Sequence, residues 1–433
     1  MSVLVDPVFA ALASGLVHVD WTADQIAAHL RRRLPRRFQS RAGDIARHLH
    51  DRFPGAASPD EERIAAALSD GPAARALVRF SDKTGELPAY IWTPARFQPI
   101  PAFATCGLPA LTTPEELADW LGLTTAQLTR FADLKGLSAQ TDNAFAPHYR
   151  HHLRPKRDGT LRLIEEPKPL LKTLQRRILR GILARVPPHD AAFGFRAGRN
   201  CTMAAARHAG EGGVVRFDLA AFFPSIAQHR VYGLFRGFGY PAPVARHLTG
   251  LCTAHTPARV LTTPGLAAAG HLSSRHLPQG APTSPALANL VAFTLDTRLA
   301  GLARRLDATY TRYADDLCFS GDARIAPVLR AALPGIVADC GFHLNPAKTR
   351  VQPAHHRQTV TGIVVNQHLN LSRRDYDRLK AQIHHLSDPA DPRRGDRAFL
   401  TRLEGRIAWL EQLNPHKGAK LRARLAAALS PGP

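Results

Sequence analysis

Two adjacent aspartates, Asp315 and Asp316, constrain the fold of this chain more than any other feature, because they interrupt a strand-like stretch. Residues 309–312 precede the pair and residues 317–320 follow it, and both runs have the composition of β-strands. Two carboxylates at the tip of a hairpin raise each other's pKa, which is costly unless a cation lies beside them. The sequence predicts such a hairpin, although an Asp–Asp turn taken alone is usually only a surface loop.

A third carboxylate ends another predicted strand. Residues 214–217 form a mainly apolar run that leads into Asp218, and 97 residues separate Asp218 from Asp315 (315 − 218 = 97). The two strands can therefore meet only through tertiary folding. Three carboxylates on neighbouring strand ends can hold two Mg²⁺ ions about 4 Å apart, and hard oxygen ligands suit Mg²⁺. The predicted metal-binding residues are Asp218, Leu219, Asp315 and Asp316, with two Mg²⁺ ions that Mn²⁺ can replace.

The excess of basic residues indicates a polyanionic partner. The 433 residues include 57 Lys and Arg against 35 Asp and Glu, which gives a net charge of +22 and an isoelectric point near 10.7. Each phosphate that a basic side chain neutralises releases counterions, so nucleic acid is the natural partner. An anionic membrane surface is the main alternative.

The cysteines and the N-terminal residues favour a reducing, cytoplasmic setting. The first 20 residues lack a basic leader, and Asp6 and Pro7 interrupt an apolar stretch that is too short to span a bilayer. We therefore expect a cytoplasmic protein with no membrane partner. The scattered cysteines contain no CxxC pair and fit neither a zinc ribbon nor a disulfide framework: Cys106, Cys201, Cys252, Cys318 and Cys340.

Residues 1–105 are expected to form a helical, basic extension. Thr22 has capping-box spacing to Gln25, and Ser58 is expected to cap a second helix that begins at Pro59. Between them lies an arginine-rich segment, which is either a solvated helix face or a clamp on an RNA backbone. The clamp is slightly preferred, although Pro35 would break one continuous helix. The segment contains Arg31, Arg32, Arg33, Arg36, Arg37 and Arg41.

A proline-rich stretch, 88–109, is typical of a linker. Thr113 and Thr124 then begin two short capped helices in succession. Such a hairpin is either a DNA-binding element or, more commonly, a packing element. From about residue 145 short apolar runs alternate with helices, as in α+β folds.

Five blocks then occur in order, at 156–175, 217–226, 277–289, 313–320 and 341–349. Together they resemble the fingers and palm blocks of bacterial reverse transcriptases, and the resemblance covers about residues 112 to 425. It implies an RNA-directed DNA polymerase of α+β class with a right-hand fold. The implied divisions are an N-terminal extension (1–105), a helical hairpin with fingers (106–213), a palm with an antiparallel sheet and finger insertions (214–366), and a helical thumb (367–433).

The resemblance also implies residue roles around the three aspartates. Phe223 lies five residues after Asp218, where the family has a ring that would collide with a ribose 2′-OH, although a plain core phenylalanine is the alternative. Lys348 corresponds to the lysine proposed to protonate the leaving pyrophosphate, or it simply contacts phosphate. The catalytic set is then Asp218, Asp315, Asp316 and Lys348. The nucleotide-binding set is Lys156, Arg162, Phe222, Phe223, Gln279, Gly280, Tyr313 and Ala314.

Two further segments resemble the retron branch of the family. Residues 358–366 look like its VTG block, and residues 204–208 correspond to its NAxxH block without the asparagine. The implied RNA contacts are Val360, Thr361, Gly362 and His208. The implied activity is copying of a cognate structured noncoding RNA, primed from a guanosine 2′-OH, into branched single-stranded DNA.

The implied partners are that RNA, the RNA–DNA hybrid and deoxynucleoside triphosphates, with an effector protein in anti-phage defence. Two alternatives remain open. One is a reverse transcriptase of another bacterial lineage, either defence-associated or intron-type. The other is a non-catalytic RNA-binding scaffold, which the intact set of acids disfavours. Histidine pairs at 151–152, 355–356 and 384–385 are expected to be neutral or to face RNA rather than to bind metal.

Overall fold

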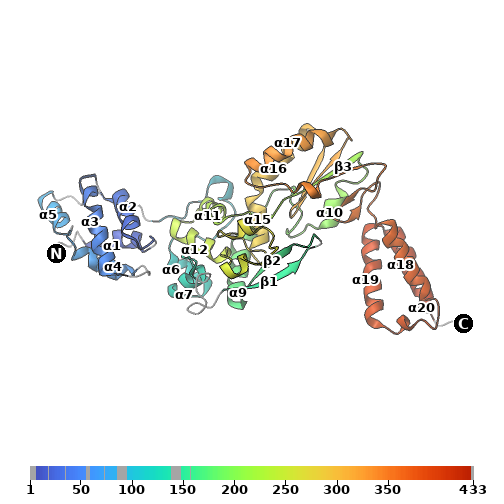
Figure 1. Ribbon diagram of the computed structural model, residues 1–433, viewed down its shortest axis with the longest axis horizontal. Helices are drawn as coiled ribbons and strands as arrows, with labels where there is room; N and C mark the ends of the chain where they lie inside the picture. Colours follow the sequence, from blue (N-terminus) through green and yellow to red (C-terminus); the bar gives the residue numbers. More distant parts are fainter. Residues whose placement is uncertain are drawn as a thin grey trace. The chain divides into compact units, whose positions relative to one another are not determined.

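The structure is a computed structural model that divides into two compact units, Met1–Arg96 and Phe97–Pro433 (Figure 1). It describes residues 6–17, 19–34, 36–54, 59–72, 74–84, 95–137, 148–156 and 158–430. Within these ranges no one helix has the length and apolar character to cross a membrane, and only the bent pair Ser284–Val291 and Phe293–Arg305 meets that test together.

The N-terminal unit is helical, as expected, and has its own hydrophobic core. Apolar residues recur at helical spacing, so each helix buries one side: Leu12 and Leu16 in the first, Ile26 and Leu30 in the second. The elements are α1 (Asp6–Leu16), α2 (Ala23–Arg33), the 3-10 helix η1 (Arg36–Arg41), α3 (Ala42–Arg52), α4 (Glu61–Ser69) and α5 (Ala74–Thr84).

The predicted caps of this unit are confirmed for α2 and corrected for α4. The Gln25 amide donates to Thr22 Oγ1 at 3.3 Å. The cap of α4 is Asp60, whose Oδ1 accepts the Arg63 amide at 2.9 Å, while Ser58 lies outside the described residues. The backbone of Asp60 is extended, and its carboxylate accepts a hydrogen bond from a first-turn amide that has no partner within the helix. The helix therefore begins at Glu61, two residues later than expected.

The second half of the expected linker is packed instead. The Gln98 amide donates to the Gly239 carbonyl at 3.0 Å, and the Ile100 amide donates to Gly237 at 3.2 Å. Gly239 has a φ of 98°, and a Cβ there would lie 2.3 Å from Pro99 N, so this close approach requires glycine. Phe103, in the 3-10 helix η2 (Pro101–Phe103), meets Phe238 edge to face at 4.9 Å. The linker prediction is therefore wrong from Phe97 onward.

The helical hairpin is a packing element, as preferred from the sequence. Thr113 caps α6 (Pro114–Leu121), and Thr124 forms a capping box with Gln127 at the start of α7 (Thr125–Ala132). The apolar sides of both helices are buried in the main core of the second unit. A Cβ on Gly250 of α12 (Ala242–Cys252) would lie 2.3 Å from the Ala132 carbonyl oxygen, so α7 and α12 are in close contact.

A two-stranded hairpin and a helix follow. Strand β1 (Tyr149–Pro155) pairs antiparallel with β2 (Leu161–Pro167), and α9 (Pro169–Gly181) and the 3-10 helix η3 (Leu183–Arg185) continue the chain. The inner residues of β2, Leu163 and Glu165, are buried, whereas most of β1 is exposed.

The four-stranded antiparallel sheet is the centre of the second unit. Its strands are β3 (Gly213–Asp218), β4 (Thr309–Tyr313), β5 (Asp316–Gly321) and β6 (Arg350–Pro353), in the order β4-β5-β3-β6. Successive side chains of a strand point to opposite faces. Val215 and Phe217 join the core with α16 (Phe293–Arg305) and α17 (Ile325–Asp339), which lie over one face in Figure 1. Val214 joins a separate cluster on the other face.

The remaining elements surround the sheet or follow it. The second cluster includes α10 (Cys201–Ala206), β7 (Thr359–Val360) and β8 (Ile363–Val364). The last helices form a bundle with its own core: α18 (Arg373–His385), α19 (Arg397–Leu413) and α20 (Pro415–Leu429). The others are α11 (Gln228–Gly237), α13 (Ala258–Leu261), α14 (Ala269–Leu272), α15 (Ser284–Val291) and the 3-10 helices η4 (Pro346–Lys348) and η5 (Pro392–Arg394). The mixed helix-and-sheet class agrees with the expectation.

A buried ion pair ties the β1–β2 hairpin to the rest of the unit. Glu165 accepts from His276 Nε2 at 2.8 Å and from the Thr256 hydroxyl at 2.9 Å. Burial alone would raise the pKa of Glu165, but the hydrogen bond and charge of His276, aided by Thr256 and His151, lower it below 4.5. Burial opposes the positive charge of His276 too, yet Glu165 raises the pKa of that imidazole above 6.5 despite the adjacent Arg275.

We predict that Glu165→Gln lowers the melting temperature most between about pH 4.5 and 6.5. The His276 contribution is complete below its unfolded pKa and is lost as pH rises through the raised folded value. The Glu165 contribution is complete above its unfolded pKa and is lost as pH falls through the lowered folded value. Thermal melts of wild type and variant across pH 4 to 9 measure this, with Glu166→Gln as the control at the half-buried neighbouring position, whose carboxylate pairs with Lys172 and His152. Parallel pH profiles for wild type and Glu165→Gln would contradict the assignment.

Candidate active site

The three aspartates meet at one end of the central sheet. Strand β3 ends at Asp218, which pairs in register with Asp316 at the start of β5. The Leu219 amide donates to the Asp315 carbonyl at 2.9 Å, which fixes the turn against the end of β3. The separation of Asp218 from the turn along the chain is therefore closed by tertiary pairing, as the sequence required.

The turn itself has an unusual backbone. Ala314 is buried and has a φ of 58°, a left-handed conformation that non-glycine residues seldom adopt. A Cβ on Gly194 would lie 2.7 Å from the Ala314 nitrogen, so the segment before α10 passes directly over the turn. Tyr313, half-buried, pairs with Asp316 across the hairpin. The small side chain of Ala314 and the glycine above it allow this close packing.

Two basic side chains face the carboxylates. Lys348 Nζ lies 3.0 Å from both carboxylate oxygens of Asp218, and Arg216 Nη2 lies 3.2 Å from Asp316 Oδ1. Asp218 is only 6% exposed, whereas the Lys348 side chain is 54% exposed. The ammonium group thus approaches a buried carboxylate from the solvent side.

Negative charge is held at this site against its electrostatic cost. Burial raises the pKa of Asp218, and the neighbouring charge of Asp316 adds to this, while Lys348 opposes it. Burial also raises the pKa of Asp315, and the charges of Asp218 and Asp316 raise it further. Carboxylates in this state favour a bound cation, because a cation restores the ionised form.

These residues fit a divalent metal by their chemistry. The donors are hard carboxylate oxygens, and the Lys348 ammonium already occupies a cation position on Asp218. Leu219 has an apolar, buried side chain, so it can contribute only its main-chain oxygen to this set. In the described ranges no three His, Cys, Asp or Glu side chains are already arranged around one metal position. Asp218 is turned to Lys348 and Asp316 to Arg216.

Beneath the turn lies a buried polar network. Arg312 Nε and Nη2 donate to the two Asp296 carboxylate oxygens at 2.8 and 2.6 Å. Arg312 Nη1 donates to Asn289 Oδ1 at 2.9 Å and to the Ala314 carbonyl at 3.1 Å. Asn289 in turn donates to the Gly194 carbonyl at 2.9 Å. The guanidinium therefore connects the strained turn to α15 and α16 and to the segment above it.

The two phenylalanines after Asp218 have different positions. Phe223 is half-buried, with ring centroids 5.5 Å from Phe222 and 6.0 Å from the exposed Phe195. Phe222 is buried against Phe342 at 5.7 Å, and Arg312 lies over its ring. Phe222 thus supports Phe223 from the core, and the expectation that it contacts the nucleotide is corrected.

The other expected nucleotide contacts lie on the β1–β2 hairpin and the loop beside it. The Glu165 amide donates to the Gln279 carbonyl at 2.8 Å. A Cβ on Gly280 would lie 2.9 Å from the Glu165 carbonyl oxygen, so the glycine permits close approach of the loop to β2. Lys156 and Arg162 lie near the hairpin tip, and Arg162 is exposed opposite Arg154.

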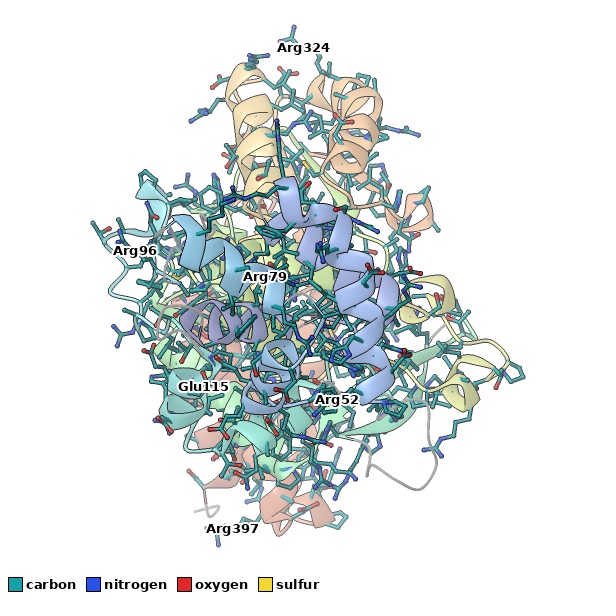
Figure 2. All side chains as sticks on the ribbon, turned by 90° about the vertical axis from the view of Figure 1, so that its left-hand side faces the viewer. Arg52, Arg79, Arg96, Glu115, Arg324 and Arg397 are labelled. Atoms are coloured by element: carbon teal, nitrogen blue, oxygen red, sulfur yellow. The ribbon has the colours of Figure 1, made fainter. Side chains whose placement is uncertain are left out.

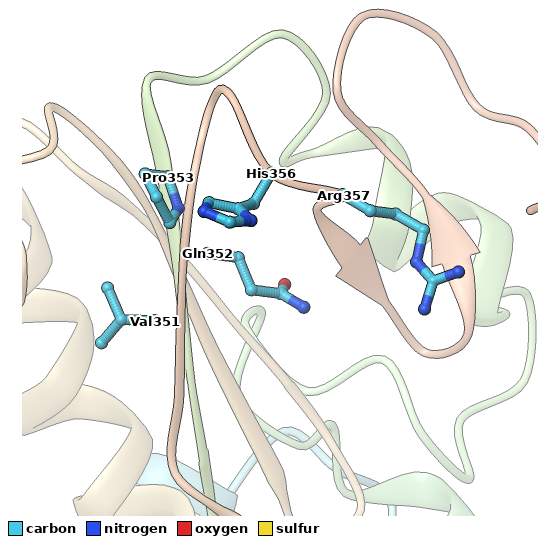
Figure 3. A pocket seen from close by; sticks show the side chains of 5 residues that line it. All are labelled: Val351, Gln352, Pro353, His356 and Arg357. Carbon is cyan, nitrogen blue, oxygen red and sulfur yellow. The ribbon is translucent and has the colours of Figure 1, made fainter.

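The expected RNA contacts are only partly at the surface. Val360 is buried in the core cluster with β8. Thr361 and Gly362 form the tip between β7 and β8 with positive φ values of 50° and 84°, and Gly362 is exposed. A pocket beside this hairpin is lined by Val351, Gln352, Pro353, His356 and Arg357 (Figure 3). Because Pro353 pairs with Gly213, the pocket lies at the end of β3 remote from Asp218.

His208 is not an RNA contact. It is fully buried, with its two ring nitrogens 2.7 Å from the hydroxyls of Ser320 and Thr311. Burial, with a smaller effect from Arg207, lowers the pKa of His208 to about 3. The imidazole is therefore neutral and joins β4 and β5 to the segment after α10, which corrects the expectation from the sequence.

Comparison with known proteins identifies the family. The family model described as reverse transcriptase (RNA-dependent DNA polymerase) matches residues 154–365. The retron Mx65 reverse transcriptase of Myxococcus xanthus is 40% identical over 322 residues, which cover 74% of this chain and 73% of that protein. The retron Mx162 reverse transcriptase of the same organism is 38% identical over 336 residues, which cover 74% of this chain and 67% of that protein. The chain belongs to the retron reverse transcriptases.

A solved telomerase from Candida albicans, in complex with a fragment of telomeric RNA, has a TM-score of 0.39 at 12% identity, covering 96% of this chain and 80% of that one. That score is too low to carry an argument.

Membership of the retron reverse transcriptases makes this protein an RNA-directed DNA polymerase, and its mixed fold fits the right-hand class. The alternatives of another lineage and of a non-catalytic scaffold are thereby set aside.

The sequence predicted Lys348 beside the retron enzyme's acids, but two other basic residues near them, Arg216 and Arg312, were missed. Arg216 is two positions before Asp218 and therefore on the same face of β3, so strand periodicity could have found it. Arg312 is a charged residue within a mostly buried strand, which is a weaker signal. Its partner Asp296 lies in a helix 16 residues earlier, and no local pattern connects the two.

We predict that Arg312→Lys lowers kcat for nucleotide addition about tenfold or more with little change in KM for the nucleotide. Lysine retains the charge but cannot bind Asp296 through two parallel hydrogen bonds, so the turn loses its fixed position. Arg298→Lys, at an exposed pair with Asp339 whose distance is 3.0 Å, is the control. Steady-state extension assays on both variants measure this. Unchanged kcat, or an equal loss in both, would show that the network does not position the turn.

Proposed function

We propose that this retron reverse transcriptase adds deoxynucleotides through metal-dependent nucleotidyl transfer at Asp218, Asp315 and Asp316. The in-register pairing of Asp218 with Asp316 carries this proposal, because it brings acids from two distant segments to one strand end. Two Mg²⁺ ions, when bound, lower the pKa of the attacking hydroxyl and stabilise the leaving pyrophosphate. The raised pKa values of Asp218 and Asp315 support a cation site of this kind.

The residues around the acids would bind and orient the substrates. The proposed palm is the four-stranded sheet, the proposed fingers include the β1–β2 hairpin, and the proposed thumb is the α18–α20 bundle. Lys348 is free to leave Asp218 for a phosphate because its side chain is largely exposed, and from there it can donate a proton to pyrophosphate. Lys156 and Arg162 would contact the triphosphate from the hairpin.

Recognition of a cognate structured noncoding RNA is proposed at the β7–β8 tip. Thr361 and Gly362 form that tip with positive φ, and the pocket of Figure 3, in which His356 and Arg357 are exposed, is lined by residues that precede β7. From its retron kinship we propose priming at a guanosine 2′-OH of this RNA. The product would be a branched RNA–DNA molecule that acts with an effector protein in cytoplasmic anti-phage defence.

Replacing Asp315 or Asp316 by Asn is expected to abolish extension of a DNA primer on an RNA template, by about a thousandfold or more. Loss of a metal-binding charge removes several kcal/mol of transition-state stabilisation, and each 1.36 kcal/mol is tenfold in rate. Folding and RNA binding should persist, since a like charge is removed from a crowded site. Asp322→Asn, an exposed acid beyond β5, is the control. Near-normal extension by either variant would exclude the metal assignment.

For Phe223→Ala we expect incorporation of ribonucleotides to rise about tenfold to a hundredfold relative to deoxynucleotides. Removal of a ring against the sugar relieves a steric clash of about 1 to 3 kcal/mol with a 2′-OH. Single-nucleotide extension with each triphosphate measures the ratio of kcat/KM values. Phe195→Ala, which removes the exposed neighbouring ring, is the matched control. An unchanged ratio in Phe223→Ala would remove its role in sugar selection.

A further inference from the structure

The N-terminal unit carries a segregated positive surface that the polymerase chemistry does not use. Residues 1–96 contain 13 Arg and Lys against 11 Asp and Glu, so the unit as a whole is almost neutral. No acid lies between Asp24 and Asp44, and the basic residues of this interval are concentrated in 31–41. We call these the Arg cluster: Arg31, Arg32, Arg33, Arg36, Arg37 and Arg41.

The cluster is held on ordered structure. Leu34, at the end of α2, is buried, and the Gln39 side chain donates to its carbonyl at 3.2 Å. Phe38 is buried in the core of the unit and anchors η1. Ala42 is fully buried where α3 begins. Buried side chains therefore fix the end of α2 and the whole of η1 to the core of the unit, while all six arginine side chains of the cluster are exposed.

Five of the six exposed guanidinium groups, all but that of Arg37, form no ion pair with an acid within the described residues of this unit. Elsewhere in the unit arginines do pair with acids, as Arg47 does with Asp44 at 2.6 Å. Positive charge at the end of α2 stabilises that helix through its dipole, but this does not account for Arg36 and Arg41, which follow it.

The chemistry of the cluster fits a phosphate backbone better than a membrane or a protein. Insertion into a membrane interface needs exposed aromatic or aliphatic side chains, and protein interfaces have an apolar centre. Within the described residues of this unit the large apolar side chains are in its core or packed against it. Arginine binds phosphate through two parallel hydrogen bonds, and it keeps its charge at every physiological pH.

We propose that the Arg cluster is a second RNA-binding site of this protein, which grips the phosphate backbone of the structured RNA through charge and without reading its sequence. This proposal rests on the proposed function in one respect, that RNA is the partner of this protein. The rest of the unit holds 11 acids against 7 basic residues, so a polyanion is repelled elsewhere and directed to this surface.

The test measures salt dependence of RNA binding by the full chain. The probe is a fluorescein-labelled RNA hairpin of about 20 base pairs, and fluorescence anisotropy gives Kd from 50 to 400 mM NaCl. For Arg31→Gln/Arg32→Gln/Arg33→Gln we expect Kd to rise roughly tenfold or more at 100 mM. The slope of log Kd against log salt should fall by about 2 to 3, since each lost phosphate contact removes about 0.9.

Two further triple variants separate this proposal from its competitors. The first changes Arg31, Arg32 and Arg33 to Lys, which keeps the charge and should retain most of the slope. The second changes Arg52, Arg75 and Arg79 to Gln, which removes the same charge outside the cluster and should leave the slope near that of wild type (Arg52 and Arg79 are labelled in Figure 2). Equal losses in the two Gln variants would overturn the proposal, because net charge alone would then explain binding.

Extension of an oligo(dT) primer on poly(rA) by the same samples keeps this test separate from the proposed polymerase function. All three variants should extend this primer at the wild-type rate, because none alters the active site. If the wild-type protein did not extend this primer, the proposed catalysis would be excluded, while the RNA-binding result would still hold. Binding of phosphatidylserine vesicles that is lost in the Arg31–Arg33 Gln variant, with hairpin binding intact, would assign the cluster to a membrane and overturn the RNA site.

Discussion

The structure around the candidate active site depends on the electrostatic cost of gathering three carboxylates at the end of one sheet. Antiparallel pairing of β3 with β5 forces Asp218 beside Asp316, and the hydrogen bond from Leu219 to the Asp315 carbonyl adds the third acid. Burial raises the pKa of Asp218 and of Asp315, and the charges of the neighbouring carboxylates raise both values further. The surrounding protein supplies cationic groups to offset this, Lys348 on Asp218 and Arg216 on Asp316.

Around that charged end the retron enzyme uses buried polar networks as rigid supports. The Arg312–Asp296 pair holds the strained Ala314 turn from below, and the Glu165–His276 pair holds the β1–β2 hairpin against the loop of Gln279 and Gly280. Replacing a buried ion pair by apolar residues is often neutral for stability, so we attribute these pairs to positional accuracy. Each ties together elements that also contain expected substrate contacts.

Basic charge is distributed differently in the two units. The N-terminal unit is nearly neutral and concentrates its arginines on one segment, so almost the whole net charge of +22 belongs to the second unit, Phe97–Pro433. The second unit can therefore supply a general electrostatic attraction to RNA, while the proposed role of the Arg cluster is local binding of phosphates. The two contributions differ in their dependence on individual residues, although both weaken with salt.

The sequence by itself determined the three acids, the strands that carry them, the capped helical hairpin and the helical nature of the first unit. These features follow from local spacing, since strand periodicity, helix caps and turn chemistry involve residues within a few positions of one another. The family resemblance, confirmed by the retron relatives, supplied the order of the blocks. Local rules failed where two features competed, as with Ser58 and Asp60 at the start of α4.

Only the tertiary structure decided which of the expected contact residues are accessible and which are buried supports. His208 matched a surface motif but lies between Ser320 and Thr311, and Phe222 supports the neighbouring Phe223 from within. Arg312 and His276 find their acids across 16 and 111 residues of sequence, respectively. Burial and long-range pairing are properties of the packed chain, because they depend on which surfaces the other elements cover.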